Sequence, residues 1–231
     1  MAKRPIFFPD PTTLPYVCEK VLEFDWFPGF SKSQAQKSIR SLHREARKQG
    51  IDPMLEISSK SEQNLGISLS AFNLFMNHNG KMMSVECAFQ GSKVFSKGGP
   101  YHDLYDATSL EAKKDVRLKE AGSVIAFNFQ GEDFPTKPLT AFYDWLYLIA
   151  LSQNHGLADK LKAYKGFSDI AFNPERSINC QARSAALFVA LSMSDRIDLD
   201  RIVKDKQYYL GTITSNQNID TESSEQLGFQ F

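Results

Sequence analysis

The sequence predicts a mixed α+β fold that is predominantly helical. Its 231 residues, 42% of them apolar and eighteen of them Phe, are enough to bury a sizeable core, as in a folded globular protein. Several long segments carry apolar residues at helical spacing, whereas shorter segments alternate between apolar and polar residues as strands do. These two patterns place helices and strands on the same chain.

The first third of the chain predicts an extended, turn-rich start followed by a basic helix. Residues 1–20 carry four prolines, and the aromatic cluster Phe24–Phe30 is closed by a Pro-Gly turn. Ser31 is a suitable N-cap for a helix over Ser33–Lys48. That helix carries a local basic face, made of Lys37, Arg40, His43, Arg44, Arg47 and Lys48. Such a face is typical either of ordinary solvation or of contact with the phosphates of a nucleic acid or nucleotide.

The middle of the chain predicts two short strands and a helix. The strands are Leu55–Ser58 and Ile67–Leu74, and Asn77–Gly80 is a turn. A helix over Met82–Phe95 follows, and we expect Gly98-Gly99-Pro100 to end it.

The second half predicts one strand among several helices. The expected elements are a helix from Ser109 with Thr108 or Ser109 as its cap, a strand over Val124–Phe129, and helices over Thr140–Leu151, Leu157–Tyr164 and Ala182–Leu191. The helix over Thr140–Leu151 is apolar on every face and is therefore expected to be buried. Asp144 inside it needs a partner, as either a structural or a catalytic carboxylate. After about residue 213 the chain is polar and we expect it to be mobile.

Three polar side chains fall on one stripe of the helix predicted over Met82–Phe95. Glu86, Gln90 and Lys93 are separated by four, three and seven positions, which places them on one side of a helix. Such a stripe is typical of a solvated polar ladder. It also fits the wall of an active site, because it borders an apolar face and precedes a Gly-Gly-Pro-Tyr turn.

Composition and motifs exclude several classes of function. Lys plus Arg equals Asp plus Glu at 27 each, which argues against broad, unspecific nucleic-acid binding but leaves room for a local basic groove. The three cysteines and four histidines show no zinc-ligand spacing, and no signal peptide or membrane span is visible, so we expect a cytoplasmic protein without metal or disulfides. No phosphate loop, GxSxG or HExxH occurs.

The classes of chemistry that these exclusions leave open are those of carboxylate, amide and lysine side chains. A buried carboxylic acid beside a lysine can cleave a bond at an anomeric carbon by protonating a leaving group or by orienting water. A desolvated lysine can instead attack an opened sugar aldehyde and form an imine. The residues alone therefore indicate a glycosidase-like site and leave both routes open.

Five blocks of sequence, in order, resemble the NADAR or YbiA-like superfamily. The most specific is Ser84–Phe95, which is similar to the family's S-E-x-x-F-Q-x-x-K-F helix. The others are Ser70–Leu74, Tyr105–Lys113 with Arg117, Ala150–Leu157 and Ser177–Ala182. Phe167–Pro174 stands where the family commonly has an acidic residue and D-x-x-W-G; it has no Trp, and Asp169 takes the place of the acidic residue.

The resemblance implies a YbiA-like single domain, with residues 1–65 as an N-terminal extension that packs on the core and holds the basic helix near 33–48. Residues 66–195 would be the catalytic core and 196–231 a C-terminal segment. The flanks resemble a subgroup of NADAR antitoxins beside DarT-type toxins, which implies removal of ADP-ribose from guanine bases of DNA without a cofactor. The implied partners are ADP-ribosylated DNA, ADP-ribose as product and the cognate toxin. A module that only binds ADP-ribose or a toxin, and an N-glycosidase of small riboflavin-pathway nucleotides, are the alternatives.

The resemblance also implies roles for individual residues. Glu86 would act as acid/base or would orient water, and Lys93 would stabilise the opening ribose electrostatically or as an imine. The implied substrate contacts are Phe72, Asn73, Gln90, Tyr101, Arg117, Asp144, Trp145, Asp169 and Asn179, and the nucleic-acid contacts are Arg40, Arg44 and Arg47. Among these, Arg117 suits a phosphate. Phe72 and Trp145 suit either core packing or stacking on a base.

Overall fold

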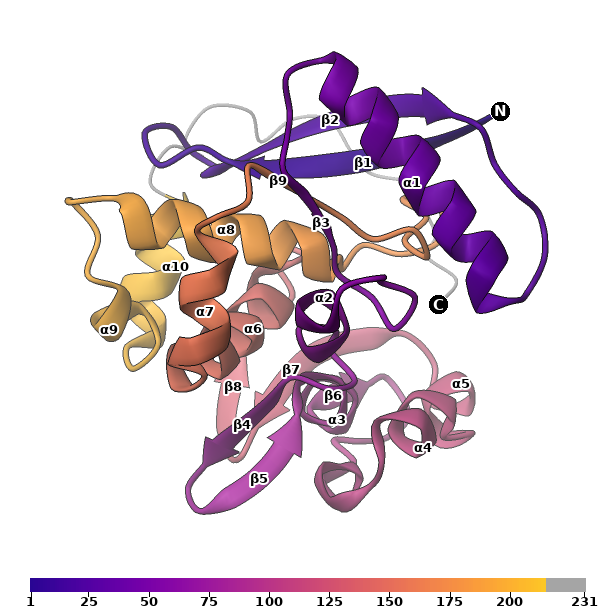
Figure 1. The fold of residues 1–231 in the computed structure, drawn as a ribbon. Coiled ribbons are helices and arrows are strands. Elements are labelled where there is room, and N and C mark those ends of the chain that lie inside the picture. The colour runs from indigo at the N-terminus through magenta and orange to yellow at the C-terminus, as the bar shows by residue number, and fades with distance from the viewer. Residues whose placement is uncertain (215–231) are drawn as a thin grey trace, which may run out of the picture.

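The computed structural model describes residues 1–214, which form a mixed α and β structure (Figure 1). Its strands are β1 (Ala2–Pro9), β2 (Val17–Phe24), β3 (Met54–Glu56), β4 (Phe75–His78), β5 (Lys81–Ser84), β6 (Lys93–Phe95), β7 (Val124–Phe129), β8 (Glu132–Phe134) and β9 (Gly166–Ser168). Its helices are α1 (Lys32–Lys48), α2 (Asn64–Ser68), α3 (Val85–Gly91), the 3-10 helix η1 (His102–Asp106), α4 (Ser109–Lys114), α5 (Arg117–Glu120), α6 (Ala141–Gln153), α7 (His155–Leu161), α8 (Gln181–Met193), α9 (Leu199–Ile202) and α10 (Lys206–Thr214).

The largest sheet joins the N-terminal hairpin to strands that are far from it in the sequence. Its strand order is β2-β1-β9-β3, with β1 antiparallel to both neighbours and β3 parallel to β9. Ile6 and Phe7 are successive residues of β1 and therefore point to opposite faces. Ile6 packs into a small core under α1, whereas Phe7 packs into the main core that includes α6 and α8. The sheet thus separates two apolar layers.

The main core is built around α6 and α8. Every residue of α6 from Ala141 to Leu151 is buried, which confirms the prediction for this apolar segment. The facing helix α8 begins with small buried residues, including Ala182, Ala185 and Ala186, and these allow α6 to approach closely. A sheet of β6, β7 and β8 and the hairpin of β4 and β5 complete the other side of the molecule (Figure 1).

The prediction of a helix over Met82–Phe95 is wrong at both ends, because the helix in the structure is shorter. It begins at Val85, where the Ser84 hydroxyl caps it by accepting a hydrogen bond from the Cys87 amide at 3.1 Å. It ends at Gly91, well before Gly98-Gly99-Pro100. The flanking residues pair with β4 and β7, because strand pairing outweighs weak helical preference in so short a segment. Lys93 therefore lies on β6, while Glu86 and Gln90 lie on α3.

One further expectation, for a strand, is also wrong. Ile67–Leu74 alternates like a strand, but its amides bond locally, as in Leu74 N–H to the Ser70 carbonyl at 2.8 Å, and α2 and a turn form instead. Residues 1–20 are extended and turn-rich, as expected, because they contain β1, the bends and turn of residues 11–16 and the start of β2. Their prolines are tolerated because β1 pairs with β9 only at Ile6 and Phe7, between Pro5 and Pro9.

Several local signals are confirmed. The Ser31 hydroxyl caps α1, Thr108 caps α4 in a capping box with Glu111, and the strand over Val124–Phe129 is β7. The segment expected to be mobile after about residue 213 lies, apart from the end of α10, outside the described residues. No helix within residues 1–214 is long and apolar enough to cross a membrane.

Candidate active site

Glu86 is a buried carboxylate at the start of α3. Its amide donates to the Ala71 carbonyl at 3.0 Å, which fixes the backbone, and its side chain is only 6% exposed. Gln90, one turn later, donates from Nε2 to Glu86 Oε1 at 2.9 Å. The polar ladder expected from the spacing of these two residues therefore exists. It is buried and holds one carboxylate oxygen in place.

Lys93 approaches Glu86 from β6. Its ammonium nitrogen lies 4.6 Å from the centre of the Phe89 ring, a cation–π arrangement. Burial lowers the pKa of Lys93 to about 8; the negative charge of Glu86 opposes this shift and the positive charge of Lys113 adds to it. An amine with this pKa can give up and regain a proton near neutral pH.

Lys113 brings a second ammonium to Glu86 from α4. Its Nζ lies 3.9 Å from Glu86 Oε1 and 5.1 Å from the centre of the Phe72 ring. The Lys113 side chain is 57% exposed, so the buried carboxylate is closest to solvent on this side. A ligand that reaches Glu86 from here would meet Lys113 and Phe72 first.

Asp169, which follows β9, supplies a second buried carboxylate. Burial raises its pKa to about 6, although hydrogen bonds from the Ala171 amide and the Gln181 side chain, and the charge of Lys113, lower it. Gln181 Nε2 donates to Asp169 at 3.0 Å, and Gln181 Oε1 accepts from the Ala71 amide at 2.8 Å. Since the Ala71 carbonyl in turn holds the Glu86 amide, one glutamine links the two carboxylates.

Tyr143 closes the cluster from α6. Its ring packs edge-on against Phe89 with centroids 5.2 Å apart. Burial, with the negative charges of Glu86 and Asp169, raises the pKa of its hydroxyl well above the ordinary value, so the phenol stays protonated. Two carboxylates, two ammonium groups and a phenol therefore surround two aromatic rings, an arrangement suited to proton transfer at a polar bond.

Sequence reasoning missed three members of this cluster: Lys113, Tyr143 and Gln181. Lys113 and Gln181 lie inside blocks that carry the family resemblance, so a signal for them was present. Tyr143 sits in a helix that is apolar on every face, where no periodicity distinguishes one aromatic residue from another. No group of three His, Cys, Asp or Glu side chains placed to hold a metal occurs in residues 1–214.

Asn73 and Asn179 differ in what their side chains contact. Asn73 is exposed and donates to the Ile67 carbonyl at 2.9 Å. Asn179, just before α8, has a buried side-chain oxygen that finds no hydrogen-bond partner within the described part of the chain. An unpaired buried acceptor carries a free-energy cost unless a ligand or water donates to it.

Arg117 is already paired with carboxylates. Its guanidinium lies 2.6 Å from Asp103 and 2.8 Å from Asp115, and it stacks 4.5 Å from the centre of the Tyr101 ring. These hydrogen bonds lower the pKa of both carboxyl groups. A phosphate at Arg117 would have to displace Asp103, the more exposed of the two partners.

Asp144 and Trp145 contact other core residues. Asp144 pairs with Arg183 and accepts a hydrogen bond from Ser184 at 2.6 Å. Trp145 is buried among Phe129 and Phe134 and donates its indole N–H to the Ile202 carbonyl at 3.0 Å. The structure therefore gives both side chains partners that hold α6 to α8 and α9.

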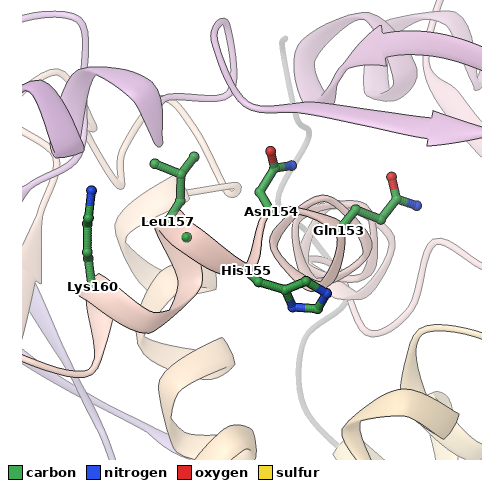
Figure 2. Close-up of a pocket in the computed structure, with 6 residues that line it drawn as sticks. Gln153, Asn154, His155, Leu157 and Lys160 are labelled. Carbon is green, nitrogen blue, oxygen red and sulfur yellow. The ribbon is translucent and has the colours of Figure 1, made fainter.

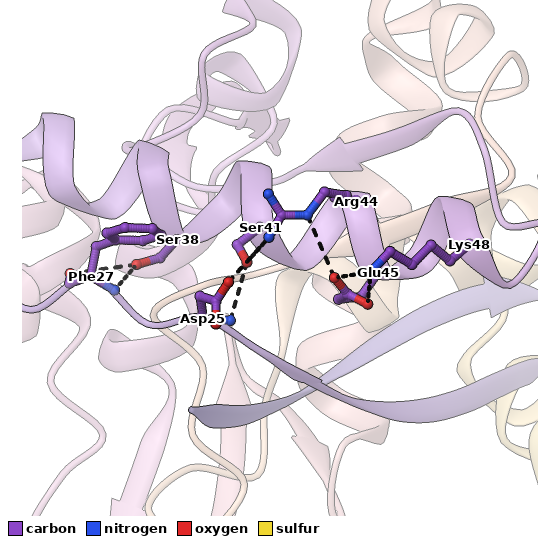
Figure 3. A network of polar contacts seen from close by, with 7 residues as sticks. All are labelled: Asp25, Phe27, Ser38, Ser41, Arg44, Glu45 and Lys48. Atoms are coloured by element: carbon purple, nitrogen blue, oxygen red, sulfur yellow. Dashed lines mark hydrogen bonds and ion pairs between the residues drawn. The ribbon is translucent and has the colours of Figure 1, made fainter.

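The arginines of the basic face of α1 are exposed and form ion pairs, whereas His43, expected on the same face, is turned inward to Ser168. Arg40 pairs with Glu62, Arg44 with Asp25 and Arg47 with Asp52, at 3.2, 3.2 and 3.3 Å. Figure 3 shows the part of this network around Arg44. Exposed pairs of this kind are weak and exchange with other anions at little cost.

A shallow pocket of about 440 Å³ lies elsewhere, at the junction of α6 and α7 (Figure 2). Gln153, Asn154, His155 and Lys160 are among the residues that line it. The amides of Gln153 and Asn154 also bond to the backbone of β4, at Asn77 and Phe75. Part of the Ala150–Leu157 block therefore serves to anchor a hairpin.

Comparison with known proteins gives one family. The model of the DarT1-associated NADAR antitoxin matches residues 2–223 of this chain. No curated protein matches it.

Proposed function

Because the chain belongs to the family of DarT1-associated NADAR antitoxins, we propose that it is an N-glycosidase that removes ADP-ribose from guanine bases of DNA. In this role it reverses a modification made by a DarT-type toxin. The observation that carries the proposal is the buried Glu86 carboxylate, held by Gln90 at 2.9 Å and flanked by Lys93 and Lys113.

The reaction is a hydrolysis at the anomeric carbon of the ribose. Glu86 takes a proton from a water molecule, whose oxygen attacks that carbon, and its negative charge stabilises the developing oxocarbenium ion. The electron pair of the carbon–nitrogen bond moves to the guanine nitrogen, which takes a proton from the Lys93 ammonium. The products are ADP-ribose, with a new hydroxyl, and unmodified guanine. Proton exchange with solvent restores Glu86 and Lys93.

The remaining residues of the cluster bind the substrate. Gln90 fixes the Glu86 oxygen, and the free acceptor on Asn179 receives a ribose hydroxyl. Phe72 offers an aromatic face beneath Lys113, and Asp169 faces the same ammonium. Arg117, which stacks on Tyr101, binds the pyrophosphate once Asp103 is displaced, and the exposed Asn73 side chain donates to a ribose hydroxyl.

Glu86→Gln is the decisive substitution, because Gln keeps the size of the side chain but cannot take a proton. We expect binding of ADP-ribose, measured by calorimetry, to stay within a few-fold of wild type, while kcat for release of ADP-ribose from modified guanine falls by roughly 10²- to 10⁴-fold. Glu175→Gln, on an exposed loop, is the control. Turnover by Glu86→Gln at the wild-type rate would remove the catalytic assignment.

Two other outcomes correspond to other functions. If the modification persists on prolonged incubation with wild-type protein despite tight binding, the protein is a module that only binds. Hydrolysis of small nucleotide intermediates with no action on DNA assigns a small-molecule N-glycosidase. Chromatography of a modified guanine oligonucleotide and of riboflavin-pathway nucleotides distinguishes all three.

A further inference from the structure

The segment Asp25–Ser31 exposes three aromatic side chains on one short loop. Trp26 and Phe27 are 39% and 37% exposed, and Phe30 is fully exposed. Pro28 and Gly29 form the turn between them, and Gly29 has a φ of +132°, which favours glycine. We call this segment the aromatic loop. An exposed apolar cluster of this kind commonly marks a binding surface.

Buried hydroxyl groups hold the aromatic loop against α1. Ser41 Oγ accepts from the Asp25 amide at 3.1 Å, and Ser38 Oγ accepts from the Phe27 amide at 3.0 Å (Figure 3). The Arg4 guanidinium lies 5.4 Å from the centre of the Trp26 ring. These contacts keep the backbone in place, so the aromatic rings are presented to solvent from a fixed support and lose little freedom on binding.

The surface beside the aromatic loop is positively charged. Residues 25–48 contain six Lys or Arg and two acidic residues, in a chain whose total formal charge is zero. Arg44 bonds to both Asp25 and Ser41, so its cation lies at the loop. Lys32 and Lys37 have no carboxylate within 4 Å among residues 1–214. Asp52 and Glu62 also pair with Arg47 and Arg40, so this surface carries six cations against four carboxylates, an excess of positive charge that complements a polyanion.

This surface adjoins the candidate active site through the inner side of α1. Ile39 and Leu42 pack in the same small core as Ile170, and His43 Nε2 lies 2.8 Å from Ser168 Oγ. Ser168 and Ile170 are the two neighbours of Asp169 in the chain. The inner side of α1 thus packs on both chain neighbours of Asp169, while the Asp169 carboxylate itself bonds to Gln181 of α8.

We propose that the aromatic loop and α1 form a platform for single-stranded DNA. Unpaired bases stack on Trp26, Phe27 and Phe30. The phosphates between them contact the side chains of Lys37, Arg40 and Arg44. Single strands fit because their base faces are free to stack, whereas a duplex covers the faces of its bases. The identity of the nucleic acid in this inference rests on the proposed function. The aromatic loop holds the strand that carries the modified guanine.

The test measures binding of an unmodified, mixed-sequence, labelled single strand of about 12 nucleotides by fluorescence anisotropy. We expect the double substitution Phe27→Ala with Phe30→Ala to raise the Kd roughly tenfold or more. We also expect it to lower by a similar factor the ratio of kcat/KM on a modified oligonucleotide to that on a modified nucleoside. Both side chains are exposed, so the thermal unfolding midpoint serves as a check that the fold is kept.

The matched control is Phe75→Ala, an equally simple truncation of an exposed Phe on β4, which should leave the Kd unchanged. An unchanged Kd in the double variant overturns the proposal, and so does binding of duplex as tight as that of single strand. Loss of binding to the cognate toxin with normal binding of DNA would make the loop a protein-binding surface. Since the Kd does not depend on hydrolysis, absence of all turnover would overturn the proposed function and leave this test intact.

Discussion

At the scale of single residues, Asp169 and Lys93 titrate on either side of neutral pH. Burial raises the pKa of Asp169 to about 6 and lowers that of Lys93 to about 8. If Asp169 acts as an anion and Lys93 as an acid, kcat/KM rises with pH through about 6 and falls through about 8, where Lys93 loses its proton. A pH–rate profile on a modified nucleoside checks both limbs.

An imine route at Lys93 predicts the opposite alkaline limb. A nucleophilic amine must be unprotonated, so turnover would keep rising above pH 8. Borohydride added during turnover would then leave a reduced ADP-ribose adduct on Lys93, detectable by mass spectrometry. We expect no adduct, and we expect Lys93→Arg, which stays protonated, to lose the alkaline limb together with much of the rate.

Asp144 is predicted to stabilise the fold without taking part in turnover. Asp144→Ala leaves the largely buried Arg183 guanidinium without its carboxylate, so the free energy of unfolding should fall by about 3–5 kcal/mol. Urea denaturation measures this. Asp159→Ala, which breaks an exposed pair with Lys162, should cost less than about 1 kcal/mol. A selective loss of kcat in Asp144→Ala, with unchanged stability, would contradict this role.

Spacing in the sequence identified part of this chemistry. Glu86 and Gln90 are four residues apart on a helix, and the structure brings them together as expected. Lys93 is close enough to feel the charge of the same carboxylate, but it lies on a strand, so its position depends on the pairing of β6 with β7 and not on helical period. Gln181 bonds to Ala71, 110 residues away in the chain, as well as to Asp169, and no single-sequence pattern reports such a contact.

At the scale of elements, Glu56 on β3 ties two layers together. It accepts hydrogen bonds from the Ser58 hydroxyl at 2.7 Å, the Ile170 amide at 2.9 Å and the Ser168 hydroxyl at 2.6 Å. Ser168 also contacts His43 of α1. Burial and the neighbouring Asp169 raise the pKa of Glu56 to about 8, whereas burial lowers that of His43 to about 4.

These shifts predict how stability depends on pH. The folded protein binds a proton at Glu56 that the unfolded chain has already lost, so the free energy of unfolding falls as pH rises from about 4.5 to about 8. His43 opposes this below its ordinary value of 6.5, because there the unfolded chain binds the extra proton. Between pH 6.5 and 8 the Glu56 effect should remain, as a fall of about 1–2 kcal/mol.

Glu56→Gln removes this titration and keeps most of the hydrogen-bonding capacity. Denaturation at pH 6.5 and pH 8 should therefore give nearly equal free energies of unfolding for the variant. Glu23→Gln, at an exposed position of β2, should keep the wild-type fall. A wild-type fall in Glu56→Gln would assign the pH dependence to another group.

Long elements could be predicted more reliably than most short ones. Helix α1 matches the expected segment because of its Ser31 cap and its periodic apolar residues, whereas α6 and α8 match because each is apolar over three or more turns. The alternation of Ile67–Leu74 is that of a strand, yet within residues 1–214 no strand pairs with it. The fold there follows tertiary contacts, such as the Tyr147 hydroxyl donating to the Leu69 carbonyl at 2.7 Å.

At the scale of the whole molecule, the hairpin of β1 and β2 completes the sheet under α1. β1 lies between β2 and β9, and Ile6 and Phe7 contribute to the two separate cores. Deleting residues 1–24 should therefore abolish cooperative unfolding, as followed by circular dichroism. Val21→Ala, on the exposed side of β2, should leave the transition in place. A truncated chain that unfolds cooperatively near the wild-type midpoint would show that residues 25–231 fold alone.

Gln181, which bonds to both Ala71 and Asp169, also sets the point during synthesis at which the hydrogen bonds of the buried cluster can be completed. Gln181 belongs to the last fifth or so of the chain, and until a ribosome has added it, Asp169 lacks that hydrogen-bond donor. At ~5–20 residues per second, roughly 5–20 seconds of translation separate Ala71 from Gln181. If Asp169 takes part in turnover, we expect a product that stops short of α8 to be inactive. Protection from a DarT-type toxin would then begin only after α8 has been made.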